Sequence, residues 1–130
     1  MSSDITRTFE RGNLHELAEF LVTPARSGIF LTRSRIRSLA QEMGLRAGVQ
    51  NRARMLENLF REAGSDGRVQ ELLGRIDGVA EENLTRYRAW AKACPPSKAA
   101  WRDWSKKTQA LRRHLAQARK WARAMKEEAS

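Results

Sequence analysis

The sequence predicts an all-α protein: a helical bundle of about five helices, with three short N-terminal helices packed on a long antiparallel C-terminal helical hairpin. Apolar residues recur at three- and four-residue spacing along nearly the whole chain, and short β-branched runs typical of strands are missing. A Pro-Pro pair at 95–96 separates two long heptad patterns, so the two arms must fold back on each other. At 130 residues, with 41% hydrophobic and 31% charged, the chain suits one compact domain. We expect its N-terminal helical segment to cover residues 1–64 and its hairpin residues 65–130.

Three short helices are expected in the N-terminal half, each bounded by its own start or stop signal. Asn13 and Glu16 have the spacing of a capping box, and Pro24 ends the helix that follows them. A glycine follows each of the next two helices, where a left-handed residue commonly ends a helix. These helices and their glycines are about residues 33–43 with Gly44 and about residues 49–63 with Gly64. The intervening segment 25–31 is expected to be a loop.

Two heptad seams define the predicted hairpin. The first seam contains Val69, Leu73, Ile76, Ala80, Asn83, Tyr87, Trp90 and Cys94, and the second contains Trp101, Trp104, Thr108, Leu111, Leu115, Ala118, Ala122, Met125 and Ala129. Folding the arms at residue 96 sets Trp90 opposite Trp101. The single polar residue of each seam, Asn83 or Thr108, then falls at the same level. We interpret this pair as a polar layer that penalises a slipped register.

Positive charge is concentrated on the last helix. The chain has 25 Lys and Arg against 15 Asp and Glu, a net charge of +10. Residues 97–130 hold ten basic and three acidic side chains, so 10 − 3 = +7 lies there. The basic residues avoid the seam, and such a ridge can hold nucleic-acid phosphates without reading sequence. The candidate contacts are Lys106, Arg112, Arg113, Arg119, Lys120 and Arg123, with Trp121 as a stacking surface for an unpaired base. The alternative is a solvated face partly neutralised by acidic residues of the other arm.

A second nucleic-acid signal lies between the second and third helices. Ala40 and Gly44 have the four-residue spacing that helix-turn-helix motifs use at their tight turn. The following helix would then present Gln50, Asn51 and Arg52, residue types that can read base edges. Any amphipathic helix pair that ends in glycine produces the same pattern, so the structural alternative stays open.

Four aromatic residues gather at the Pro-Pro end of the hairpin: Tyr87, Trp90, Trp101 and Trp104. Large aromatic side chains at helical spacing favour core packing. If the N-terminal helices do not reach that end, the same group forms an exposed patch that binds another protein subunit or a second copy of the chain.

The chain shows no arrangement of residues typical of an enzyme. His15 and His114 are isolated, and no Gly-rich phosphate loop or nucleophile elbow occurs. With one cysteine, Cys94, neither an intramolecular disulfide nor a cysteine-based zinc site can form, and we expect that side chain to pack on the seam. No transmembrane run or signal peptide is evident, so a cytoplasmic location is expected.

These observations predict a non-enzymatic, nucleic-acid-associated helical protein that holds the phosphate backbone through its basic C-terminal helix. The alternative is a protein-interaction module, an adaptor or chaperone-like helical protein or a subunit of a larger complex. In either case we expect no cofactor, no metal ion, no small-molecule substrate and no membrane partner.

Overall fold

The computed structural model describes residues 13–129, with side chains as far as residue 124, and it confirms the all-α prediction. Within the described residues there are six α-helices, one 3-10 turn and no strand. The helices are α2 (Leu14–Leu21), α3 (Pro24–Ser27), α4 (Arg33–Met43), α5 (Arg52–Ser65), α6 (Val69–Ala93) and α7 (Lys98–Ala129). The predicted seam positions Met125 and Ala129 lie outside the residues whose side chains are described.

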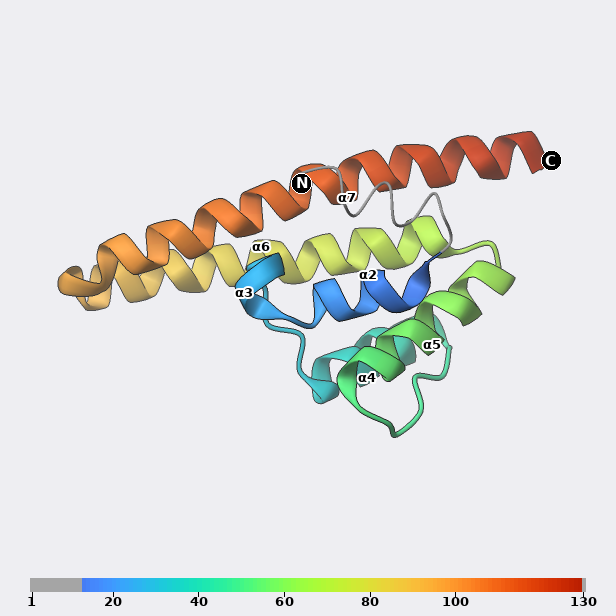
Figure 1. Ribbon diagram of the computed structural model, residues 1–130, viewed down its shortest axis with the longest axis horizontal. Helices are drawn as coiled ribbons and strands as arrows, with labels where there is room; N and C mark the ends of the chain where they lie inside the picture. Colours follow the sequence, from blue (N-terminus) through green and yellow to red (C-terminus); the bar gives the residue numbers. More distant parts are fainter. Residues whose placement is uncertain (1–12, 130) are drawn as a thin grey trace.

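The two long helices form one layer and the short helices form a second layer beneath it (Figure 1). Helices α6 and α7 run side by side in opposite directions and are joined by the 3-10 turn Pro95–Ser97. Helix α2 packs on α5, both α4 and α5 pack on α6, and α3 touches α7. The closed end of the hairpin extends beyond the short helices (Figure 1). We call this end, residues 86–110, the hairpin tip.

Local capping explains where α2 and α4 begin and end. The Asn13 side chain accepts a hydrogen bond from the Glu16 amide at 3.2 Å, as the capping-box spacing predicts. Thr32 does the same for the amide of Arg35 at 3.0 Å. Gly44 ends α4 in the left-handed region, with a φ of 68°, which confirms its predicted role.

Two predictions about the short helices were wrong. Residues 24–27 form the one-turn helix α3, so four short helices precede the hairpin within the described residues instead of three. Proline fits the first position of a helix because its nitrogen needs no partner there, so Pro24 starts α3 after ending α2. The third helix, expected over about residues 49–63 and ended by Gly64, is α5 at Arg52–Ser65. It begins at Arg52 because Asn51 caps it, and it continues through Gly64 to end near Gly67, whose φ is 68°.

The core lies between the two layers and along the middle of the hairpin. Ile76, Ala80, Leu111 and Leu115 of the two seams are all at most 1% exposed. Helix α6 is buried on a second face as well, through Leu72, Val79 and Leu84, which are turned toward the short helices. Burial then declines toward the tip, where Trp90 is 42% exposed.

The buried polar pair holds the connection between α3 and α4 on the hairpin. Asn83 accepts a hydrogen bond from the Phe30 amide at 3.0 Å, and the Thr108 hydroxyl lies 2.7 Å from the Gly28 carbonyl oxygen. The Tyr87 hydroxyl donates to that same carbonyl at 2.6 Å. Asn83 and Thr108 therefore bind a third segment, a role beyond the register layer that we interpreted from the sequence.

Candidate nucleic-acid interface

Four basic side chains line the outer face of α7, away from the seam. Arg102, Lys106, Arg113 and Lys120 are spaced by four, seven and seven residues, which places them on one helical face, and all are exposed. None of them forms an ion pair or side-chain hydrogen bond with another described residue. We call these four residues the outer basic stripe. Lys106, Arg113 and Lys120 follow one another at about 10.5 Å along the helix axis.

The other predicted phosphate contacts on α7 are directed toward α6. Arg112 binds Asp77 through two hydrogen bonds of 2.8 and 3.1 Å, and this carboxylate raises the pKa of the guanidinium. Arg123 reaches the amide oxygen of Gln70 at 2.9 and 3.1 Å when that amide is turned toward it. Arg112 is therefore already paired within the hairpin, whereas Arg123 is exposed and meets Gln70 only in that amide orientation.

Arg119 and Trp121 of α7 also point inward, Arg119 toward α6 and Trp121 toward the hydrophobic core. The Arg119 guanidinium covers Gly74, 3.5 Å from the position that a β-carbon would occupy there. Trp121 is half-buried and packs against the hydrophobic core, so it is not the open stacking surface expected from its basic neighbours. The outer basic stripe is therefore the part of α7 best placed to meet an external anion.

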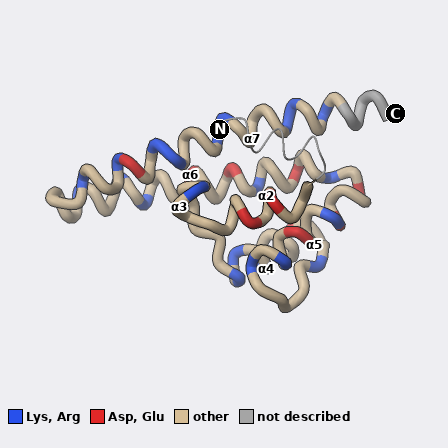
Figure 2. Tube along the Cα trace, viewed as in Figure 1, with Lys and Arg blue, Asp and Glu red and all other residues tan. Residues whose placement is uncertain are grey.

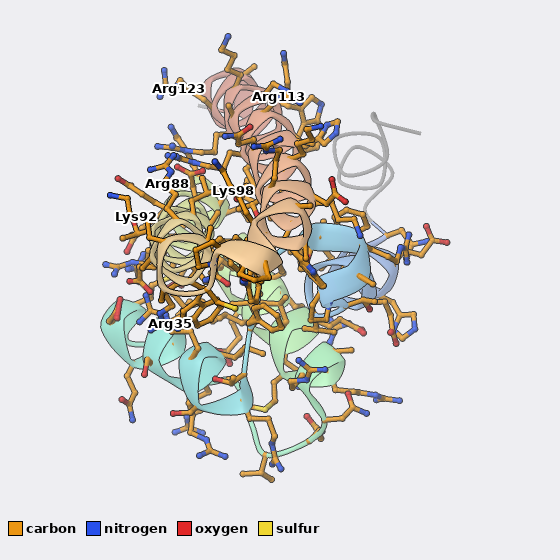
Figure 3. The ribbon with its side chains drawn as sticks, turned by 90° about the vertical axis from the view of Figure 1, so that its left-hand side faces the viewer. Arg35, Arg88, Lys92, Lys98, Arg113 and Arg123 are labelled. Atoms are coloured by element: carbon orange, nitrogen blue, oxygen red, sulfur yellow. The ribbon has the colours of Figure 1, made fainter. Side chains whose placement is uncertain are left out.

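The hairpin tip is more basic than the sequence reasoning recognised. Residues 86–110 contain seven basic side chains and one acidic one, so 7 − 1 = +6 of the net charge lies there. The basic ones are Arg86, Arg88, Lys92, Lys98, Arg102, Lys106 and Lys107. Arg88, Lys92 and Lys98 lie on the side of the tip away from α2 and α3 (Figure 3). Counting charge across the Pro-Pro turn, rather than along α7 alone, would have found this cluster.

Elsewhere along the chain, basic and acidic residues are interspersed (Figure 2). Arg35 pairs with Glu82 at 2.9 Å, and Arg75 pairs with Glu42 at 2.8 Å. These ion pairs neutralise part of the positive charge of the short helices, although residues 33–65 hold seven basic and three acidic side chains and so keep a net charge of 7 − 3 = +4. Unpaired positive charge remains over the tip and the outer basic stripe, and also on the short-helix side at the exposed Arg37, Arg46 and Arg54.

The three residues considered for base reading have partners within the fold. Gln50 accepts a hydrogen bond from Asn58 at 2.9 Å, Asn51 caps α5, and Arg52 donates to the carbonyl of Leu31 at 3.2 Å. The connection between α4 and α5 spans residues 44–51, longer than the three or four residues of a helix-turn-helix turn. Base contacts by these side chains would require them to leave these bonds.

The aromatic residues near the tip form a continuous row of ring contacts. Phe30 stacks on Trp104 with ring centroids 5.6 Å apart, and Trp104 lies 6.4 Å from Tyr87. Tyr87 stacks on Trp101 at 5.5 Å, and Trp101 contacts Trp90 at 4.8 Å. We call these five residues the aromatic row. Phe30 was not part of the predicted group, because it enters from the connection between α3 and α4.

The aromatic row is buried at its centre and exposed at its ends. Tyr87 is 1% exposed, as expected of a core residue, and this burial raises the pKa of its hydroxyl. Phe30 and Trp90 are each 42% exposed, so the core interpretation was wrong for Trp90. The reason is that the short helices stop before the tip (Figure 1). Cys94, expected to pack on the seam, is exposed as well.

A shallow apolar cavity of about 440 Å³ lies at the Trp90 end of the row. It is lined by Trp90, Ala93, Cys94, Ser97 and Trp101. Among the described residues, no three His, Cys, Asp or Glu side chains gather where they could hold a metal ion. None of the helices described is apolar over enough of its length to span a bilayer.

Comparison of the chain with protein-family models, with curated proteins and with solved structures finds no match.

Proposed function

We propose that this chain is a non-enzymatic cytoplasmic protein that binds nucleic acid through the phosphate backbone. The observation that supports the proposal is the outer basic stripe: exposed cations on one face of α7, none paired with another described residue. Unpaired surface cations attract a polyanion, and binding gains entropy because counterions are released from the nucleic acid.

The geometry of the stripe favours backbone holding over sequence reading. Helix α7 has 32 residues, a length of about 48 Å, and its cations repeat along a nearly continuous line. Long Lys and Arg side chains on such a line can reach successive phosphates without entering a groove. The stripe carries only Lys and Arg, and it lacks the Asn, Gln and carboxylate side chains that read adenine and cytosine edges in the major groove.

The proposal is tested by removing three charges from the stripe. The variant Lys106→Gln, Arg113→Gln, Lys120→Gln lowers the net charge from +10 to +7 and keeps helix propensity nearly constant. Its affinity for mixed-sequence duplex DNA should fall sharply. The slope of log K against log salt should also become shallower by about 0.9 unit for each phosphate that the variant no longer neutralises.

A matched control removes the same charge from another surface. Arg37, Arg46 and Arg54 are exposed, and their side chains make no hydrogen bond or ion pair with another described residue. Changing these three to Gln should leave the salt slope close to that of the parent protein. Equal reductions of affinity in the two triple variants would show that net charge alone drives binding, and the stripe would have no special role.

A second candidate function is a protein-interaction module that uses the aromatic row. The exposure of Trp90 beside an apolar cavity supports it, because such patches often mark binding surfaces. Salt separates the two functions. Polyanion binding weakens steeply as salt rises, whereas an apolar interface persists.

A further inference from the structure

We propose that the aromatic row and the cations beside it bind single-stranded nucleic acid, with an unpaired base stacking at the Trp90 end. The inference rests on the proposed function for the class of ligand, but it is centred on the aromatic row at the hairpin tip, which shares only Arg102 and Lys106 with the outer basic stripe. It also goes further, because it predicts a preference for single strands over duplexes.

The first support is the shape of the row. Its rings are in unbroken contact from Phe30 to Trp90, and both ends are open to solvent. The cavity beside Trp90 and Trp101 has a volume of about 440 Å³ and an apolar lining. The cavity is shallow and open, so a base would lie against the Trp90 and Trp101 rings that line it. A base can therefore add to the row as one more ring.

The second support is rigidity. Tyr87, at the centre of the row, is buried and donates its hydroxyl to Gly28 at 2.6 Å. Trp104 is held between the Phe30 ring and the Lys107 ammonium group, which lies 5.1 Å from the centre of the indole. A platform fixed before binding loses little conformational entropy when a ligand arrives.

The third support is charge, which also selects the occupant. Lys92 and Lys98 are next in sequence to the lining residues Ala93 and Ser97, and Arg86 lies one helical turn before Trp90 on the same face of α6. With a charge of +6 over residues 86–110, the surroundings suit an anionic ligand that also carries flat apolar groups. A single strand offers both features. A duplex keeps its bases stacked inside and can offer only phosphates.

The experiment compares three probes of equal length: oligo-dT, an abasic strand with the same phosphates, and a duplex. Trp90→Ala should weaken oligo-dT binding by about five- to 150-fold, the range for removal of one stacked base. Binding of the abasic strand and of the duplex should be nearly unchanged, because both depend on phosphates. Trp90→Phe keeps a ring and should retain most of the affinity for oligo-dT.

Controls separate this inference from folding and from the proposed function. Trp90 is 42% exposed, so circular dichroism melting should show Trp90→Ala to be folded. Phe30→Ala, at the other exposed end, provides a second test of the row. If the triple variant of the outer basic stripe loses duplex binding while both aromatic variants bind oligo-dT like the parent, the inference fails and the proposed function stands. If the parent protein binds no probe, both fail.

The row could instead dock another protein surface, and the same variants reveal it. Sedimentation would then show a dimer of the parent protein that Trp90→Ala abolishes, while oligo-dT binding stays unchanged. That result would assign the row to a second copy of the chain and overturn the single-strand inference.

Discussion

Replacing Gly28 by alanine tests how the short helices are held on the hairpin. Gly28 has a φ of 80°, in the left-handed region that residues with a β-carbon rarely adopt. A β-carbon at this position would lie 2.6 Å from the Thr108 amide nitrogen and 2.8 Å from the Lys107 β-carbon. Both distances are shorter than real contacts, and one neighbour is backbone, so the 28–30 segment must move away from α7.

The expected decrease in stability follows from two contributions. The left-handed backbone costs about 1–2 kcal/mol for a residue other than glycine. Overpacking a closely fitted site costs about 1–3 kcal/mol more. Gly28→Ala should therefore lower the free energy of unfolding by about 2–5 kcal/mol, a large share of the total of about 5–15 kcal/mol for a typical domain.

Urea denaturation with linear extrapolation measures this change, and Gly44→Ala is the matched control. Gly44 has a φ of 68°, but nothing lies within 4 Å of its added β-carbon. Its substitution should cost only the backbone contribution of about 1–2 kcal/mol. The close approach of the 28–30 segment to α7 would be refuted if Gly28→Ala were no more destabilising than Gly44→Ala.

Three further predictions follow from burial, pairing and protonation. Leu111→Ala should lower the unfolding free energy by about 2–5 kcal/mol in urea denaturation, because Leu111 is 1% exposed. Trp90→Ala should lower it by less, because Trp90 is 42% exposed, and the reverse order would contradict this assignment of the core. Arg112→Gln should weaken duplex binding less than Arg113→Gln in the same titration, because Asp77 already holds Arg112; an equal weakening would show that the Asp77 pair opens on binding. Hydrogen bonds from His15 and Arg61 lower the pKa of Glu57, so its contribution to stability is present above the ordinary glutamate pKa and is lost as pH falls through the lowered value. The difference in unfolding free energy between the parent and Glu57→Gln should therefore shrink on acidification from neutral pH, and a constant difference would exclude this linkage.

Local signals were sufficient to predict the ends of α2 and α4. The Asn13 cap, the range 33–43 and the left-handed Gly44 each depend on a few neighbouring residues, and the structure confirms them. Pro24 was harder, because proline stops one helix and can also start the next. The role of Asn83 and Thr108 depends on the 28–30 segment, which lies more than 50 residues away in sequence, so no local pattern could have revealed it.

The heptad phase correctly kept the basic residues of α7 off the seam, but it did not separate flanking positions from outer ones. Arg112 and Arg119 stand beside the seam, where they reach across to α6. Lys106 and Arg113 stand opposite it and stay in solvent. A finer treatment of helical phase would have separated Arg112 and Arg119 from Lys106 and Arg113. The exposure of Trp90 could not be predicted from the sequence, because it depends on how far the short helices extend along the hairpin.

The most direct test of the central claim is the binding of the parent protein to mixed-sequence duplex DNA as salt is raised from about 50 mM. We expect a dissociation constant in or below the range of about 10⁻⁴ to 10⁻⁶ M that is typical of non-specific binders, with log K falling linearly as log salt rises. Absence of binding at about 10⁻⁴ M protein in about 50 mM salt, or binding that does not weaken as salt rises, would contradict the proposal that α7 holds nucleic-acid phosphates.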